Sequence, residues 1–262
     1  MPRDLGDVIH YFIPEAAARR EEASAHPPPR SADARERRAV VAIPVGDGDV
    51  LRAAFAWNLC VELARAGAEA SLVAARDESS EAVWPGDGPG PLGCRVALLD
   101  RAPAAEIART ALAQAAERSG GRARCVLACV PELALREVAA GPDAPGTWLV
   151  LCAADDDGRR RAAAAVLDIA RAAPAARIGA TIHGVRSIAE ARTAFDALAS
   201  ATDAAIPRPI ASYGLVADDL HLYRAILSQR PVGLAHPQSP AARTLADVAA
   251  LLVEDIGGAA DA

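Results

Sequence analysis

The chain contains no lysine, so all 28 of its basic residues are arginines. In a phosphate-binding loop a lysine normally contacts the β- and γ-phosphates, and that contact is excluded here. Arginine is a poor substitute, because its guanidinium is a planar fork whereas the lysine ammonium is a compact point charge. Abundant alanine, with arginine in place of lysine, is also typical of a GC-rich bacterial genome.

Aromatic residues make up only 3% of the chain, although apolar residues reach 52%. The core must therefore be built from alanine, valine, leucine and isoleucine, which suits helices packed on a parallel sheet. No stretch approaches the length of about 18 uncharged apolar residues that a membrane span requires. The N-terminus also lacks the apolar core of a secretory signal. We therefore expect a cytoplasmic protein that does not insert into a membrane.

Basic patches are scarce as well. The net charge is −6 and the sequence pI is about 5.4, and no basic stripe stands out, which argues against a general nucleic-acid binder. The run Arg159–Arg161 follows the acidic run Asp155–Asp157 after one glycine, so these charges cancel locally. We interpret that stretch as the solvated start of a helix.

The five cysteines are an odd number and lie mostly in apolar contexts, which favours free buried thiols in a reducing compartment. Cys125 and Cys129 lie four residues apart on an expected buried strand. They would share a face of that strand but would be roughly 13 Å apart. We therefore predict no metal site.

The chain divides into three parts. Residues 1–38 are expected to form a short helix and a proline-rich linker, 39–255 an α/β domain, and 256–262 a disordered tail. The first part holds an apolar cluster that is a candidate partner-binding segment, formed by Tyr11, Phe12 and Ile13. The alternative is that this segment folds back onto the domain as an extra helix.

Within the domain, apolar strands alternate with amphipathic helices. The expected strands cover residues 39–45, 70–74, 95–100, 124–130, 147–152, 177–183, 209–214 and 232–235. The expected helices cover residues 50–66, 104–118, 133–140, 158–172, 187–198, 220–228 and 240–252. Continuously apolar strands indicate burial on both faces. The pattern predicts a doubly wound, mainly parallel sheet with helices on both faces, in a single layered domain.

The first strand leads through a glycine-containing turn into a helix, which is the layout of a phosphate-binding loop. Free N–H groups at such a helix start attract anions. Asp47 and Asp49 would repel a triphosphate instead, and Ala53 has no oxygen to hold a magnesium ion. The residues that we assign to this vestigial site are Gly46, Asp47, Gly48, Asp49, Arg52 and Ala53. We predict no cofactor, with ATP and magnesium as the alternative if the arginine contacts the phosphates.

The helix after this turn resembles one in a known family. The stretch from Gly46 to Gly67 aligns without a gap with the loop and first helix of the MinD/ParA/FlhG group of deviant P-loop ATPases. It ends AFAWNLCVELARAG where those proteins read roughly TVAANLAVALARAG, and Asn58 falls at the family asparagine. This chain departs from the family loop GKGGVGKT at several positions. Asp47 stands at a signature lysine and Leu51 at a glycine. Arg52 stands at the phosphate lysine, and Ala53 stands at the magnesium threonine.

The resemblance extends along the chain to about Val253. The segment 126–131 is similar to the family's Walker B strand, with Cys129 at the aspartate. The segment 183–191 is similar to N-x-V-x-S-x-x-E-A, with His183 at an asparagine that contacts adenine. The C-terminal segments 213–219 and 230–242 are similar to the family's LGxIPxD and RPVV…PxSPAA patterns. The resemblance implies a P-loop NTPase-like fold whose nucleotide-contacting residues have been replaced.

Three functions fit these observations. The first is a MinD/FlhG-like pseudo-ATPase that binds protein partners, or acts as a scaffold, in bacterial cell organisation. This function is compatible with a homodimer. The second is a nucleotide-binding switch in which Arg52 replaces the loop lysine. The third is an enzyme that uses another site on the same sheet. That enzyme would use His183 as a base beside Asp100 or Asp218, or Cys129 as a nucleophile.

Overall fold

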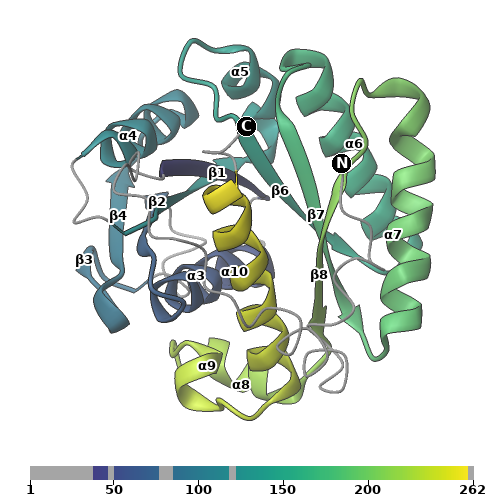
Figure 1. Cartoon of the computed structure of the whole chain (residues 1–262). Coiled ribbons are helices and arrows are strands. Elements are labelled where there is room, and N and C mark those ends of the chain that lie inside the picture. Colours follow the sequence, from purple (N-terminus) through teal and green to yellow (C-terminus); the bar gives the residue numbers. More distant parts are fainter. Residues whose placement is uncertain (1–37, 47–49, 77–84, 118–121, 259–262) are drawn as a thin grey trace, which may run out of the picture.

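The computed structural model describes residues 38–46, 50–76, 85–117 and 122–258. There, eight strands form one sheet in the order β3-β4-β2-β5-β1-β6-β7-β8 (Figure 1). All neighbouring strands run parallel except β3, which pairs antiparallel with β4 at one edge. The strands are β1 (Arg38–Val45), β2 (Glu69–Arg76), β3 (Gly88–Pro89), β4 (Arg95–Asp100), β5 (Arg124–Pro131), β6 (Thr147–Ala153), β7 (Arg177–Val185) and β8 (Ala211–Ala217). The predicted doubly wound, mainly parallel α/β fold is confirmed.

Helices cover both faces of the sheet (Figure 1). They are α3 (Val50–Arg65), α4 (Ala104–Ala116), α5 (Leu135–Ala140), α6 (Asp156–Ala172), α7 (Ile188–Thr202), α8 (Leu220–Leu227), α9 (Val232–Ala235) and α10 (Pro240–Gly258). The chain winds from β1 through α3 to β2, and then in the opposite direction from β4 to β8. Because such crossovers are right-handed, α3 lies on one face and α4 to α7 on the other. α10 packs on β8 beside α3.

The core is built from small aliphatic side chains, as the composition predicts. β5 buries every residue from Cys125 to Val130. Cys125 and Cys129 belong to the core cluster that includes α3, whereas Val126 and Ala128 pack with α4. The two cysteines therefore share a face of the strand, as expected. All five cysteines of the chain are buried and free.

One expected strand, at residues 232–235, is instead the short helix α9. The carbonyl of Pro231 accepts hydrogen bonds from the N–H groups of Leu234 at 3.0 Å and Ala235 at 2.9 Å. Proline fixes the backbone in a conformation compatible with a helix start. The apolar run is too short to reveal a period, so alternation alone could not distinguish strand from helix.

The C-terminal boundary also differs from the prediction. α10 continues past Leu252 to Gly258, and Ile256 is buried at 7% exposure. The predicted disordered tail therefore does not begin at residue 256. Burial of Ile256 extends the apolar face of α10. Among the described residues we find no helix with the length and hydrophobicity that a bilayer span requires.

α10 carries a carboxyl group whose ionisation opposes folding. Burial raises the pKa of Asp247 to about 7, although nearby Arg243 lowers it. Between about pH 4 and pH 7 the folded chain keeps a proton that the unfolded chain has lost, so stability falls as the pH rises. Asp247→Asn should therefore stabilise the protein at pH 8, by about 1–2 kcal/mol after allowance for the half-buried position.

Urea unfolding of wild type and Asp247→Asn at pH 5 and pH 8 checks this expectation, because the difference between the two should grow with pH. The exposed Asp196→Asn on α7 is the matched control, and its effect should stay within about 0.5 kcal/mol at both pH values. A constant difference across this range would show that Asp247 ionises normally.

Candidate functional site

The winding direction of the sheet reverses at β1. In open α/β sheets, ligands bind at the carboxyl ends of the strands where this reversal occurs, and here β1 is flanked by β5 and β6. Gly46 follows β1, and Arg52 and Ala53 lie in the first turn of α3. These predicted residues therefore lie at the carboxyl end of β1. Other predicted site residues fall outside the described residues, namely Asp47, Gly48, Asp49, Tyr11, Phe12 and Ile13.

Arg52 forms an ion pair within the chain. Its Nη1 donates a hydrogen bond to Oε1 of Glu132, and the two side chains are 9% and 32% exposed. Glu132 opens the short 3-10 helix η3 (Glu132–Ala134) directly after β5. β5 runs beside β1, with Pro131 opposite Val45, and this register brings Glu132 to the first turn of α3. The guanidinium at the lysine position is thus already engaged by a carboxylate.

Glu132 was not among the residues predicted from the sequence, although it directly follows the Walker B-like segment 126–131. The available signal was an acidic residue at the end of an apolar strand, one position beyond the proline of that segment. Its pairing with Arg52 depends on β1 lying next to β5, and strand order cannot be read from one sequence.

Ala53 and Cys129 stand where the resemblance places the magnesium threonine and the Walker B aspartate, and neither side chain carries an oxygen. Ala53 is 1% exposed, and Cys129 is 4% exposed. Burial raises the pKa of the Cys129 thiol well above its usual range, so this residue is a neutral core thiol and not the nucleophile that we considered. Within the described residues no group of three His, Cys, Asp or Glu side chains could hold a metal ion.

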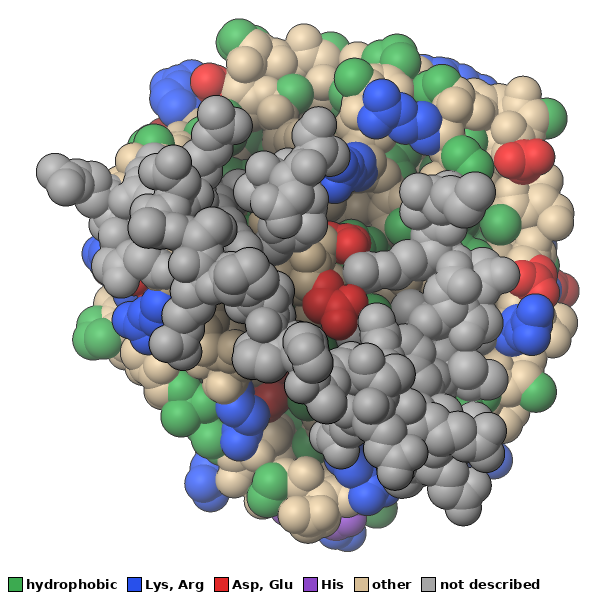
Figure 2. All heavy atoms as spheres, in the orientation of Figure 1, with side chains coloured by type: hydrophobic (Ala, Val, Ile, Leu, Met, Phe, Trp, Pro, Cys, Tyr) green, Lys and Arg blue, Asp and Glu red, His purple; other side chains and the backbone are tan. Residues whose placement is uncertain are grey.

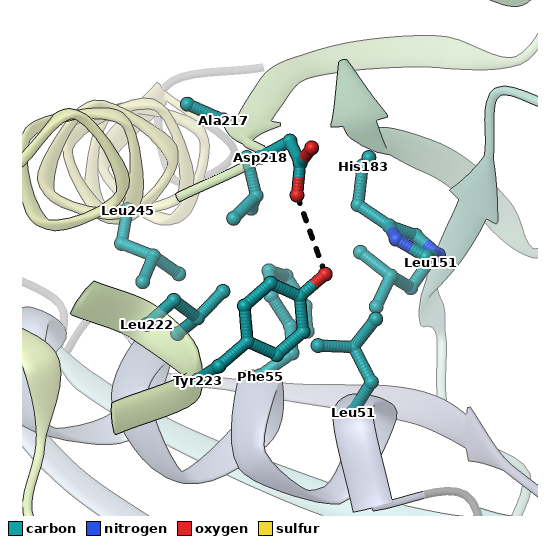
Figure 3. Close-up of a pocket in the computed structure, with 11 residues that line it drawn as sticks. Leu51, Phe55, Leu151, His183, Ala217, Asp218, Leu222, Tyr223 and Leu245 are labelled. Atoms are coloured by element: carbon teal, nitrogen blue, oxygen red, sulfur yellow. Dashed lines mark hydrogen bonds between the residues drawn. The ribbon is translucent and has the colours of Figure 1, made fainter. Parts of the chain in front are cut away.

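Beside the first turn of α3 lies a small hollow of about 20 Å³ (Figure 3). Most of its wall is apolar, with Leu51 and Phe55 contributed by α3 and Leu245 by α10. Its polar groups include Asp218 and the hydroxyl of Tyr223, which donates a hydrogen bond to Oδ1 of Asp218 at 3.3 Å. A space of this volume has room for about one water molecule. Leu51 places a branched side chain where the family has a glycine.

His183 borders the same hollow at the carboxyl end of β7 (Figure 3). Asp218 lines that hollow too, and it also pairs with Nε of Arg186 at 3.5 Å. Asp100, the other predicted partner, ends β4, five strand spacings from β7, or about 24 Å at about 4.8 Å each. It forms an ion pair with Arg76 at 2.9 Å. The structure therefore groups His183 with Asp218 and excludes Asp100.

On the part of the face that grey atoms leave visible in Figure 2, both acidic and basic side chains appear.

This strand order, with a helix leaving the turn after a central strand, defines the chain as having a P-loop NTPase-like fold. Solved structures that it resembles include MinD- and ParA-type ATPases. The MinD cell division protein of Aquifex aeolicus matches with a TM-score of 0.60 and 14% identity, over 82% of this chain and 97% of that chain. A ParA family ATPase from Chlorobium tepidum TLS gives 0.55 and 12%, over 81% and 98%. An ATP complex of a Cyanothece McdA variant gives 0.55 and 12%, over 85% and 97%.

No protein-family model matches the chain, and no curated protein matches it significantly by sequence. At 12–14% identity, the structural likeness shows the fold, which is the fold that the sequence resemblance implied. It does not transfer an activity, because one fold supports many functions.

Proposed function

We propose that this chain is a pseudo-ATPase with a MinD/ParA-type fold, which acts as a protein-binding or scaffold module in bacterial cell organisation. The ion pair between Arg52 and Glu132 is the observation that supports this most strongly. Arg52 stands where the resemblance places the phosphate lysine, and a carboxylate of the same chain engages it. At the neighbouring positions Leu51 adds bulk and Ala53 lacks the magnesium-binding oxygen.

The electrostatics of that pair oppose polyphosphate. A phosphate that approached Arg52 would also approach Glu132, which has the same sign of charge. One like-charge pair at about 4 Å costs roughly 4 kcal/mol at an effective dielectric of about 20, and this corresponds to about three decades in affinity. Phosphate could avoid the repulsion only by displacing Glu132, which would forfeit the existing ion pair.

Titration of the wild-type chain with Mg-ATP in a calorimeter should show no binding up to millimolar nucleotide. Glu132→Ala removes the competing carboxylate and frees Arg52, so we expect any residual affinity for ATP to rise, by roughly tenfold or more. Glu137→Ala on the exposed side of α5 is the matched control, and it should leave the titration unchanged.

Micromolar binding by the wild type together with turnover would contradict the proposal. If that binding were lost in Arg52→Ala, the nucleotide-binding switch would be the correct function, with ATP and magnesium as its cofactors. Binding that survives Arg52→Ala would place the nucleotide away from this residue.

A second candidate function is an enzyme centred on His183, favoured by the position of this residue beside Asp218 in one hollow. Among the described residues, the wall of the hollow supplies no serine, threonine, cysteine or lysine, so in this candidate His183 acts as a general base. A hydrolase or transferase activity that disappears in His183→Ala would establish it.

A protein partner fits the scaffold role. One structural neighbour is the MinC:MinD cell division protein complex of Aquifex aeolicus, at 14% identity and a TM-score of 0.60. We propose by analogy that this chain also binds a protein, through Tyr11, Phe12 and Ile13. The test compares the affinity of a protein partner for the full chain with its affinity for the chain without residues 1–37. Equal affinities would refute this assignment.

A further inference from the structure

A second pocket lies at the opposite end of the sheet from Arg52, where β1, β6 and β7 begin. Its volume is about 570 Å³, whereas the hollow beside α3 holds about 20 Å³. Val40 and Val41 of β1 line it, together with Thr147 and Arg177, the first residues of β6 and β7. Pockets that bury a bound group typically have volumes of about 300–1,000 Å³. We call this space the amino-end pocket.

The amino-end pocket follows from an offset between neighbouring strands. β1 begins at Arg38, but Val41 is its first residue opposite β6, so β1 extends beyond the start of β6. Helix ends from both faces of the sheet complete a largely aliphatic wall: α4 contributes Leu112 and Ala115, and α10 contributes Leu252 and Ile256. An aliphatic wall of this kind is stabilised when apolar side chains cover it.

The polypeptide enters the domain at the edge of this pocket. The described residues begin at Arg38, and Ala39 already lines the pocket. The preceding residues 1–37 carry the apolar cluster of Tyr11, Phe12 and Ile13. At about 3.3 Å per extended residue, residues 14–37 can span up to about 80 Å. The linker is therefore long enough for the cluster to turn back into the pocket.

The other end of the chain is a poorer occupant. α10 also ends beside the pocket, but residues 259–262 read Ala-Ala-Asp-Ala and offer no large apolar side chain. The acidic residues Asp7 and Glu15 flank the N-terminal cluster, and the exposed Arg177 at the pocket provides a charge of opposite sign. Asp255 lines the pocket too, where its Oδ2 accepts a hydrogen bond from the hydroxyl of Tyr213 at 2.5 Å.

We propose that the N-terminal segment around Tyr11, Phe12 and Ile13 docks in the amino-end pocket of its own domain. These three side chains pack against the aliphatic wall between α4 and α10. Because segment and pocket belong to one chain, the effective concentration is on the order of millimolar, so a weak contact is sufficient. The docking requires neither a nucleotide nor a partner. A partner that binds the same three side chains, as proposed above, must first displace them from the pocket.

Disulfide trapping in the full chain tests this docking. His10→Cys places a thiol beside the intact cluster, and Ala175→Cys places one at the pocket, where Ala175 is exposed. Mild oxidation should join the two within one chain. The matched control pairs His10→Cys with Ala189→Cys, because Ala189 is an exposed alanine in the first turn of α7, at the carboxyl end of the sheet. We expect the pocket pair to close roughly tenfold faster than this control.

A third substitution separates docking from simple nearness of the linker. Phe12→Glu places a carboxylate against the aliphatic wall, which is unfavourable, so it should bring the two closure rates close together. The five native cysteines are buried and give little background, and circular dichroism shows whether each variant is folded. Equal rates for the pocket pair and the control overturn the proposal, and so does a fast pocket pair that Phe12→Glu leaves unchanged. Disulfides that form mainly between two chains would place the segment on a second copy, and they also overturn it.

Discussion

Trp148→Ala should lower the free energy of unfolding by about 3–5 kcal/mol. Trp148 lies on β6 between Ala42 of β1 and Ile178 of β7, and its side chain is fully buried. Its indole Nε1 also donates a hydrogen bond to the carbonyl of Pro145 at 3.1 Å. The surrounding core is rich in alanine, and such short side chains cannot move inward to fill the space that the indole leaves. The cost should therefore lie in the upper part of the usual range.

Urea denaturation followed by circular dichroism measures this loss. Trp148→Phe separates its two causes, because phenylalanine refills most of the volume but cannot donate to Pro145. It should cost less than the alanine variant, by at least about 1 kcal/mol. Equal losses in the two variants would show that the hydrogen bond, and not the packing, determines the effect.

The fold could be predicted because its signals are local. Residues 125–130 of β5 are apolar throughout, and α3 is followed by Gly67, which has a φ of +92°. A positive φ is the conformation that glycine accepts at a helix end. Asp219 likewise caps α8, accepting a hydrogen bond from the N–H of His221 at 2.9 Å. Each of these elements is specified by a few consecutive residues, so a single sequence reveals them.

The site could be predicted only in part, because its contacts join distant segments. Arg52 and Ala53 were identified from the loop, but Glu132 is 80 positions from Arg52 and meets it through the order of the strands. The grouping of His183 with Asp218 in one hollow depends on that order as well.

Asn58, the only asparagine in the chain, provides the second large effect. Its side chain is 3% exposed and joins α3 to α9. Nδ2 donates to the carbonyl of Ala54 at 2.7 Å, and Oδ1 accepts from the N–H of Val232 at 2.7 Å. Val232 is fully buried at the start of α9. The match with the family asparagine therefore has a structural role here: it holds α9 against α3.

The same contact is reinforced one turn further along α3. Glu62 pairs with Nε of Arg65 at 2.9 Å, and Nη2 of Arg65 donates to the carbonyl of Gly233 at 2.9 Å. Burial raises the pKa of Glu62, although Arg65 opposes this shift. A Cβ atom at position 233 would meet Oε1 of Glu62 at 1.9 Å, so a larger residue there requires the Glu62 side chain to shift. α9 thus approaches α3 closely enough that side chains of α3 hydrogen-bond its backbone.

Asn58→Ala should destabilise the protein by about 2–4 kcal/mol, since it leaves the buried N–H of Val232 without its acceptor and opens a small cavity. Thr193→Ala on α7 is the control: its hydroxyl donates to the carbonyl of Ala189 at 3.0 Å in an exposed position, and its loss should cost less than about 0.5 kcal/mol. Urea unfolding gives both values, and hydrogen exchange locates the change. If the amides of residues 232–235 keep their protection in Asn58→Ala, α9 is held by packing alone. The resemblance at this asparagine would then have no structural basis in this chain.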